Sequence, residues 1–447
     1  MNKYLLPPLL LTTFLQACGG SSPSTPEVPV EPIEYSFSLT AQLTNACGAK
    51  SAFTDIELLL QDDNWQTLNR YSADENGVIS FVTTNEFINY TIVAKDQQGT
   101  EAEGLNVVSF YQASSNTPAH YQARFDNALD NSNCECVSQN LELTHRPFTT
   151  QVKVTSSLPF DNWLAIDDKT TLFEGVEVCR EIDGDWPLHS FSVSGTDNNE
   201  KEIASAEFVD DFTSDGSGAW RVSAFQVADS FELAAQHQAF TTHQVINNSA
   251  HFSSSVAEDD ESLLVFSTHD YISEAYYQSK ASITFDESSS IFGSSVIKTQ
   301  QQLTSTDKGL SFAVKASESK PNIDDRNFSE IKADGSYDYS AVNGYPMAII
   351  TFTFTAFDPE SNLLMPAKWS FYGPEQGTLA ISAPLTGYED IISIDTDKKS
   401  TEVRLIQSLA TDSYQDYIKF YQGEYGLGIT EEFAKNVNEV EISITLN

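Results

Sequence analysis

Residues that could perform catalysis occur throughout the chain, but their spacing matches no catalytic motif. Serine precedes lysine by three positions in four stretches that read as strand or loop rather than helix: Ser295, Ser305, Ser317 and Ser329. The nearest histidines, His237, His243 and His251, have spacings that suit a shared metal on neither a helix nor a strand. The 64 acidic residues are so widespread that no carboxylate pair for glycoside hydrolysis can be chosen. We therefore assign no catalytic residue, no metal and no cofactor.

Four cysteines point to a different chemistry, the formation of disulfide bonds. They are Cys47, Cys134, Cys136 and Cys179, and an even number in a secreted chain indicates disulfides. A bond between Cys134 and Cys136 is excluded, because residues two apart in a strand place their Cα atoms ~6.6 Å apart, at the limit for a disulfide. In both remaining pairings, one of these two cysteines bonds to Cys47 and the other to Cys179. A four-thiolate zinc site is the alternative.

The fifth cysteine lies at the end of an apolar N-terminal run. Lys3 is followed by the largely apolar stretch 4–15, which is shorter than the roughly 20 residues that span a bilayer and has the layout of a secretory signal. The sequence Leu15-Gln16-Ala17-Cys18 resembles the lipobox of bacterial lipoproteins. The resemblance implies that residues 1–17 are a signal peptide, removed after Ala17, and that Cys18 becomes a diacylglyceryl thioether that is acylated at its new amino group.

The same resemblance implies a location. Gly19 stands where lipoproteins retained in the inner membrane carry aspartate, so we expect an outer-membrane protein held by the lipid on Cys18, on either the periplasmic or the outer face. Residues 18–34 then form the anchor and a linker rich in Gly, Ser and Pro. Extended at ~3.1 Å per residue, the fourteen residues 19–32 of this linker would hold the folded part on the order of 40 Å from the lipid. An ordinary secretory signal with an incidental cysteine is the alternative.

The charge of the chain restricts its partners. The formal net charge is −40 at pH 7, from 24 Lys and Arg against 64 Asp and Glu. Nucleic acid is excluded as a natural partner, because binding to phosphates requires Lys and Arg. An anionic membrane surface would repel the chain as well, so membrane attachment has to be covalent.

Strand-like alternation of apolar and polar residues predicts an all-β fold of several antiparallel β-sandwiches with little helix. Residues 35–44 alternate with a period of two, and Asn76-Gly77 predicts a hairpin turn because both residues tolerate positive φ. Helical candidates are confined to 414–421 and 431–435. We expect β-rich domains at 35–146, 147–287 and 288–447.

The stretch 51–98 has a family resemblance of its own. The segments Asp55-Ile-Glu-Leu, Tyr71 to Phe81 and Tyr90-Thr-Ile-Val-Ala are similar to the prealbumin-like or carboxypeptidase-regulatory-like Ig-type domain. The resemblance implies an accessory module that packs, spaces or binds without catalytic residues.

These observations favour a non-enzymatic lipoprotein that binds, spaces or scaffolds at the cell envelope, with an unidentified protein or glycan as its ligand. Aromatic rings near turns could stack on sugars or on a protein partner, although packing is their commoner role. The rings in question are Trp163, Trp186, Tyr276, Tyr277, Trp369, Tyr372, Tyr414, Tyr417, Tyr421 and Tyr425. The alternative is a surface or periplasmic hydrolase acting on polysaccharide, with a β-sandwich catalytic unit after residue 147.

Overall fold

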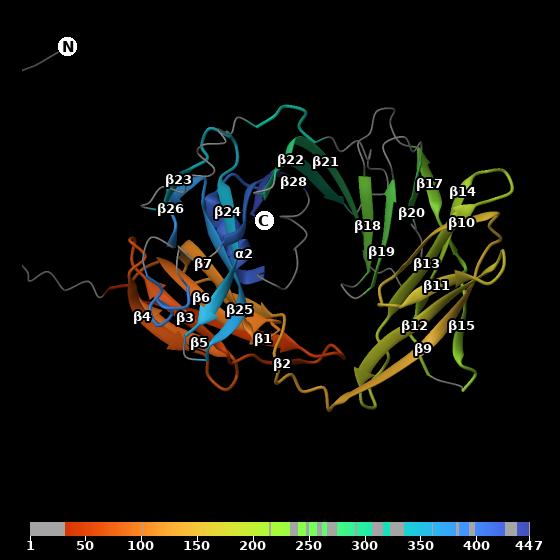
Figure 1. Ribbon diagram of the computed structural model, residues 1–447, viewed down its shortest axis with the longest axis horizontal. Helices are drawn as coiled ribbons and strands as arrows, with labels where there is room; N and C mark the ends of the chain where they lie inside the picture. Colours follow the sequence, from red (N-terminus) through yellow and green to blue (C-terminus); the bar gives the residue numbers. More distant parts are fainter. Residues whose placement is uncertain are drawn as a thin grey trace, which may run out of the picture.

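The computed structural model describes residues 32–446, apart from short internal gaps (Figure 1). The gaps are 101, 214–215, 233–239, 247–249, 257–261, 266–274, 291–292, 306–315, 322–334, 360, 381–383, 393–397 and 425–435. Strands make up 59% of the chain and helix 4%, which confirms the all-β prediction. Within the described residues, no helix is both long and apolar enough to cross a membrane.

A four-stranded sheet forms one layer of the first sandwich. Its strands are β1 (Tyr35–Thr44), β2 (Lys50–Ala52), β5 (Val78–Thr83) and β8 (Ala119–Ala123). β1 pairs antiparallel with β2 and β5 and parallel with β8. The alternation in β1 is realised as predicted, because Phe37, Leu39, Ala41 and Leu43 are all buried. These side chains form the inner face of the layer.

A twelve-stranded sheet forms the second layer and extends well beyond it. Its order is β19-β18-β21-β22-β28-β27-β24-β25-β7-β6-β3-β4. The N-terminal strands are β3 (Ile56–Gln61), β4 (Thr67–Ser72), β6 (Phe87–Gln97) and β7 (Gly104–Ser114). The others are β18 (Phe240–Ile246), β19 (Ala250–Val256), β21 (Ala275–Ser290), β22 (Gly293–Ser305), β24 (Met347–Asp358), β25 (Leu363–Pro374), β27 (Lys398–Ser408) and β28 (Asn436–Leu446).

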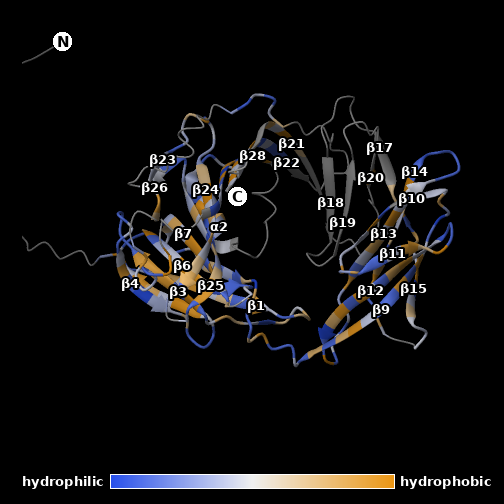
Figure 2. Ribbon diagram, in the orientation of Figure 1, coloured by the Kyte–Doolittle hydropathy of each residue, from blue (hydrophilic) through white to orange (hydrophobic). Residues whose placement is uncertain are grey.

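The two groups of strands meet where β7 runs parallel to β25. Their register pairs Leu105 with Ala367 and Phe110 with Tyr372, and every other pairing in the sheet is antiparallel. The sheet has an apolar core on each face, and Figure 2 shows apolar residues concentrated on β3, β6, β7 and β25. Helix α2 (Tyr414–Glu424), expected at 414–421, adds Tyr417 and Ile418 to the core under the four-stranded sheet.

The turn at Asn76-Gly77 forms, but it does not make a hairpin. Asp74 Oδ1 accepts hydrogen bonds from the backbone N–H groups of Asn76 and Val78, and Gly77 has a φ of +72°. The turn instead carries the chain from β4 in the large sheet to β5 in the small one. A turn signal reports local backbone geometry, whereas the partner of each flanking strand is decided by packing.

The second sandwich consists of two four-stranded sheets, ordered β11-β12-β9-β15 and β10-β13-β14-β16. Its strands are β9 (Cys134–Thr144), β10 (Thr150–Ser156), β11 (Asn162–Ala165), β12 (Thr170–Glu181), β13 (His189–Thr196), β14 (Glu202–Val209), β15 (Ala219–Ser223) and β16 (Gln226–Val227). Aromatic rings dominate the core between the sheets, including Phe173, Phe191, Phe212 and Trp220. Two further pairs are β17 (Asp229–Glu232) with β20 (Ser262–Val265) and β23 (Ser336–Asp338) with β26 (Gln376–Thr378).

The strand pairing differs from the expected division into 35–146, 147–287 and 288–447 in two respects. β9 belongs to the sheet of β12 and not to the first sandwich. The strands β24, β25, β27 and β28 complete the sheet and the core that the N-terminal strands begin. Pairing between strands far apart in sequence leaves no local signal, so a division into consecutive segments could not include it.

The four cysteines form two disulfides, Cys47–Cys134 and Cys136–Cys179, as expected from their number. This is one of the two pairings that the sequence left open. Cys136 and Cys179 face each other across β9 and β12, and Cys47–Cys134 ties the loop after β1 to the start of β9. Because all four sulfurs are bonded in pairs, none is available as a zinc thiolate.

His189 gives the second sandwich a dependence on pH. The ring lies 5.8 Å from that of Phe212, and burial lowers its pKa from the usual 6.5 to about 4. As pH falls from about 6.5 to 4, this histidine binds a proton in the unfolded chain but not in the folded chain. The free energy of unfolding therefore decreases over this pH range. In the His189→Gln variant, we expect the decrease in the free energy of unfolding on acidification to be smaller by about 1–3 kcal/mol. Urea unfolding of both proteins at pH 7 and pH 4.5 measures it, and an unchanged difference between the two pH values would contradict this assignment.

Candidate functional site

A cleft of about 620 Å³ lies on the face of the large sheet away from the small one. Its walls come from four parts of the chain: β3 and β4, the connection between β6 and β7, the turn between β24 and β25, and the loop 387–391. The floor is partly apolar, with Val93, Leu105 and Met365 among its residues. A concave site with an apolar floor and polar groups on its walls is the usual form of a small-ligand site.

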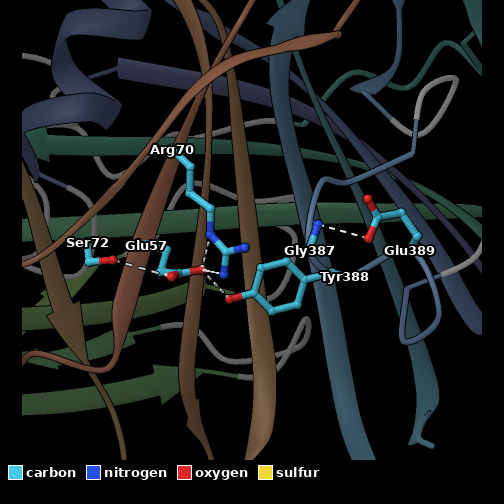
Figure 3. Close-up of polar contacts among 6 residues, drawn as sticks. All are labelled: Glu57, Arg70, Ser72, Gly387, Tyr388 and Glu389. Carbon is cyan, nitrogen blue, oxygen red and sulfur yellow. Dashed lines mark hydrogen bonds and ion pairs between the residues drawn. The ribbon is translucent and has the colours of Figure 1, made fainter.

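Glu57 is the centre of the polar groups in this cleft (Figure 3). Its Oε2 atom accepts hydrogen bonds from Arg70 Nε at 2.8 Å and from Tyr388 Oη at 2.8 Å, and it also forms an ion pair with Arg70 Nη2. Ser72 Oγ donates to Oε1 at 3.4 Å. Glu57 faces Ser72 directly across β3 and β4, and Arg70 is its diagonal neighbour, so the strand register brings these three together.

The electrostatics of this group follow from its contacts. The hydrogen bonds to Glu57 raise the pKa of Arg70. Burial raises the pKa of Tyr388, and the nearby carboxylate of Glu57 raises it further. The phenol therefore stays protonated and donates, the guanidinium stays charged, and Glu57 accepts from both. The guanidinium also lies over the Tyr388 ring, with Arg70 Cζ 5.4 Å from its centroid.

Gly387 allows the loop to come this close. Its φ is +84°, and a Cβ added there would lie 2.1 Å from Arg70 Nη1. Glu389 Oε2 accepts a hydrogen bond from the Gly387 N–H at 2.9 Å, which fixes the turn (Figure 3). Leu385 and Ile392, on either side of the turn, are buried in the core below. The loop is thus anchored by apolar side chains and oriented by the Glu57 contacts.

Six carboxylates and two cations line the cleft. They are Asp55, Glu57, Glu103, Asp358, Glu389 and Asp390, with Arg70 and Lys95. This lining offers hydrogen-bond acceptors to hydroxyl or cationic groups and would repel an anion. Arg70, Tyr388 and Ser72 already donate hydrogen bonds to the carboxylate oxygens of Glu57. Among the described carboxyl groups, burial raises the pKa of Asp96, which is not part of the cleft.

None of the described residues that were expected to be functional from sequence lines the cleft. Several of the expected residues lie outside the described part of the chain: the signal peptide 1–17, Cys18, His237 and Tyr425. Of the segment 18–34, only the last three residues are described. His243 and His251 lie in the paired strands β18 and β19. Of the aromatic residues proposed for stacking, several are buried in the cores: Trp186, Trp369, Tyr372 and Tyr417. They pack rather than present a flat surface to a ligand.

Sequence reasoning missed Glu57, Arg70 and Tyr388. The first two could have been found from the pairing of β3 with β4, which places opposite charges diagonally across an antiparallel pair. Tyr388 carries no such signal, because its loop reaches the cleft only through the tertiary fold.

We expect Glu57→Ala to destabilise the protein by about 1–3 kcal/mol, because Tyr388 Oη and the Arg70 guanidinium lose their shared acceptor. The loop 384–392 should also become more accessible, which hydrogen–deuterium exchange would detect as faster exchange in peptides from this loop. Glu135→Ala is a matched control, since Glu135 forms a comparable ion pair with Arg180 in the second sandwich. Faster exchange of the loop in the control, or unchanged exchange in Glu57→Ala, would contradict the role of Glu57.

Comparisons with known proteins assign no family. No family model matches the chain, and no curated protein matches it. A crystal structure of BcpA, the major pilin subunit of Bacillus cereus, is similar with 10% sequence identity, over 66% of this chain and 97% of the pilin, at a TM-score of 0.15. At that TM-score, the likeness carries no argument about function.

Proposed function

We propose that the protein is a lipid-anchored, non-enzymatic component of the bacterial cell envelope that binds, spaces or scaffolds. The observation that carries the proposal is the partition of the five cysteines. Four are joined in two disulfides, which form and persist in oxidising compartments outside the cytoplasm. The fifth, Cys18, stands in the lipobox-like sequence that follows the apolar N-terminal run.

The structure supports a binding role more than a catalytic one. The polar side chains at the centre of the cleft form hydrogen bonds with one another. These bonds fix the shape of the cleft and leave no side chain of the group positioned as a reactive group. The carboxylates on its walls suit a ligand that is rich in hydroxyl groups, such as a glycan, or a cationic side chain of a protein. A nucleic acid remains excluded by charge.

Mass spectrometry of the protein purified from membranes tests the anchor. We expect a mature N-terminus at Cys18 that carries three acyl chains, and a Cys18→Ser variant that keeps residues 1–17 and loses the lipid. An unmodified Cys18 thiol in the membrane-extracted protein would refute the anchor.

The binding role is tested with the full chain on a glycan array, alongside a panel of ester, peptide and polysaccharide substrates. We expect glycan retention that Glu57→Ala weakens and Glu135→Ala leaves unchanged. Turnover of any substrate that a single Asp, Glu, His or Ser substitution abolishes would overturn the non-enzymatic proposal in favour of the hydrolase.

A further inference from the structure

Three polar side chains meet inside the first sandwich, at the join between β7 and β25. The register places Asn106 of β7 between Ala94 of β6 and Lys368 of β25. Side chains at paired positions point to the same face of a sheet, about 4.8 Å apart along the hydrogen-bond direction. Asn106 and Lys368 therefore lie side by side on the face that packs against the small sheet.

Asp96 completes the group through hydrogen bonds. Asn106 Nδ2 donates to Tyr121 Oη at 2.8 Å, and Tyr121 Oη donates to Asp96 Oδ2 at 2.9 Å. The backbone N–H of Arg124 also donates to Oδ2, at 3.2 Å. Asp96 is 1% exposed and Asn106 5% exposed, next to the apolar residues of the core. Asp96 Oδ1 is buried and has no hydrogen-bond partner among the described residues.

Burial shifts the pKa of the acid and of the amine toward their neutral forms. It raises the pKa of Asp96, although the hydrogen bonds that Asp96 shares with Tyr121, Arg124 and Asn106 act in the opposite direction. It lowers the pKa of Lys368, and the charge of Arg124 lowers it further. No ion pair of Lys368 lies within the part of the chain that the structure describes. A neutral lysine amine is a nucleophile, and a neutral acid beside an amide can polarise its carbonyl.

We propose that Lys368 and Asn106 form an intramolecular isopeptide bond, with Asp96 as the catalytic acid and base. The lone pair of Lys368 Nζ attacks Cγ of Asn106, while the carboxylic acid of Asp96 donates a hydrogen bond to the amide oxygen. The Nζ–Cγ bond forms and the Cγ–Nδ2 bond breaks. The proton lost by Nζ passes through Asp96 to Nδ2, which leaves as ammonia. The reaction exchanges one amide for another and needs no oxidant or reductant.

The product would join the N-terminal and C-terminal parts of the large sheet by a covalent bond. β7 and β25 are the only parallel neighbours in that sheet, within the described strands, and hydrogen bonds are otherwise what holds them edge to edge. The isopeptide bond also replaces a half-buried amine, which can be protonated, with an amide that carries no charge.

Peptide mapping of the purified full-length protein tests the bond. After proteolysis with trypsin, we expect the peptides that contain Asn106 and Lys368 to be recovered as one branched peptide, lighter than their sum by one ammonia. Cleavage after Lys368 should be lost. Recovery of the two peptides as separate, unmodified species from the folded protein overturns the proposal, and this measurement does not depend on any variant.

Variants assign the roles. Lys368→Arg keeps the charge but replaces the amine nucleophile, Asn106→Ala removes the acceptor, and Asp96→Asn removes the acid, so each should yield only linear peptides. Lys298→Met is the matched control, because Lys298 is another lysine of the same sheet, paired with Glu441, and this variant should keep the branched peptide. Circular dichroism and recovery of both disulfides establish that a variant has folded. A branched peptide in folded Asp96→Asn at the wild-type level would overturn the catalytic assignment of Asp96.

Discussion

Replacing Trp65 with alanine is expected to lower the free energy of unfolding by about 3–5 kcal/mol, the range for a buried tryptophan. Trp65 is 0% exposed and lies in the loop between β3 and β4. Its ring packs edge-on against Phe371 of β25 at 5.4 Å between centroids, and its Nε1 atom donates to the Thr378 carbonyl at 2.9 Å. The substitution therefore removes a contact that holds the N-terminal loop against the C-terminal strands.

The backbone at Trp65 adds to this expectation. Its φ of +62° lies in the left-handed region, which is costly for a residue with a large side chain. Ring packing compensates that cost in the folded protein, and alanine would retain the strain without the packing. Guanidinium unfolding followed by tyrosine and tryptophan fluorescence measures the loss. Leu68→Ala, at an exposed neighbouring position, should change the stability by less than about 0.5 kcal/mol, and an equal effect of both substitutions would contradict the argument.

Removing the Cys47–Cys134 disulfide should cost about 2–5 kcal/mol, because the bond restricts the unfolded chain across 87 residues. The Cys136–Cys179 bond spans 43 residues, about half as many, so its loss should cost about 0.6 kcal/mol less if loop entropy dominates. Double Cys→Ala variants of each pair, compared by urea unfolding without reductant, measure both costs. Addition of dithiothreitol to the wild-type protein should reproduce the combined loss. Stability that is unaffected by reductant would count against both bonds.

Local patterns were sufficient to predict the fold class and several elements. The period of two in β1 and the apolar residues of α2 could be recognised in the sequence. A strand or helix with one face in a core has apolar residues that recur with the period of that element. The number of cysteines predicted two disulfides, and the two-residue spacing of Cys134 and Cys136 along a strand excluded one of the three pairings. Each of these inferences needs only neighbouring residues or simple geometry.

The architecture beyond those elements depends on contacts between distant segments. Nothing within residues 104–114 indicates that β25 will pair with them. The sequence of a buried strand is largely apolar whichever strand pairs with it. The cleft has the same origin: Tyr388 reaches Glu57 only after β24 and β25 have joined the N-terminal strands. The sequence therefore predicts the side chains available for a site but not which of them meet.

The parallel join between β7 and β25 also sets an order of events as the chain is made. Synthesis proceeds from the N-terminus, so the open edge of β7 has to wait until β25 exists. The second sandwich lies between them in the chain and contains all the strands of its own two sheets, so it can be complete first. An unpaired strand edge invites association with other chains. Until β25 is available, the edge of β7 therefore stays open to association with other chains.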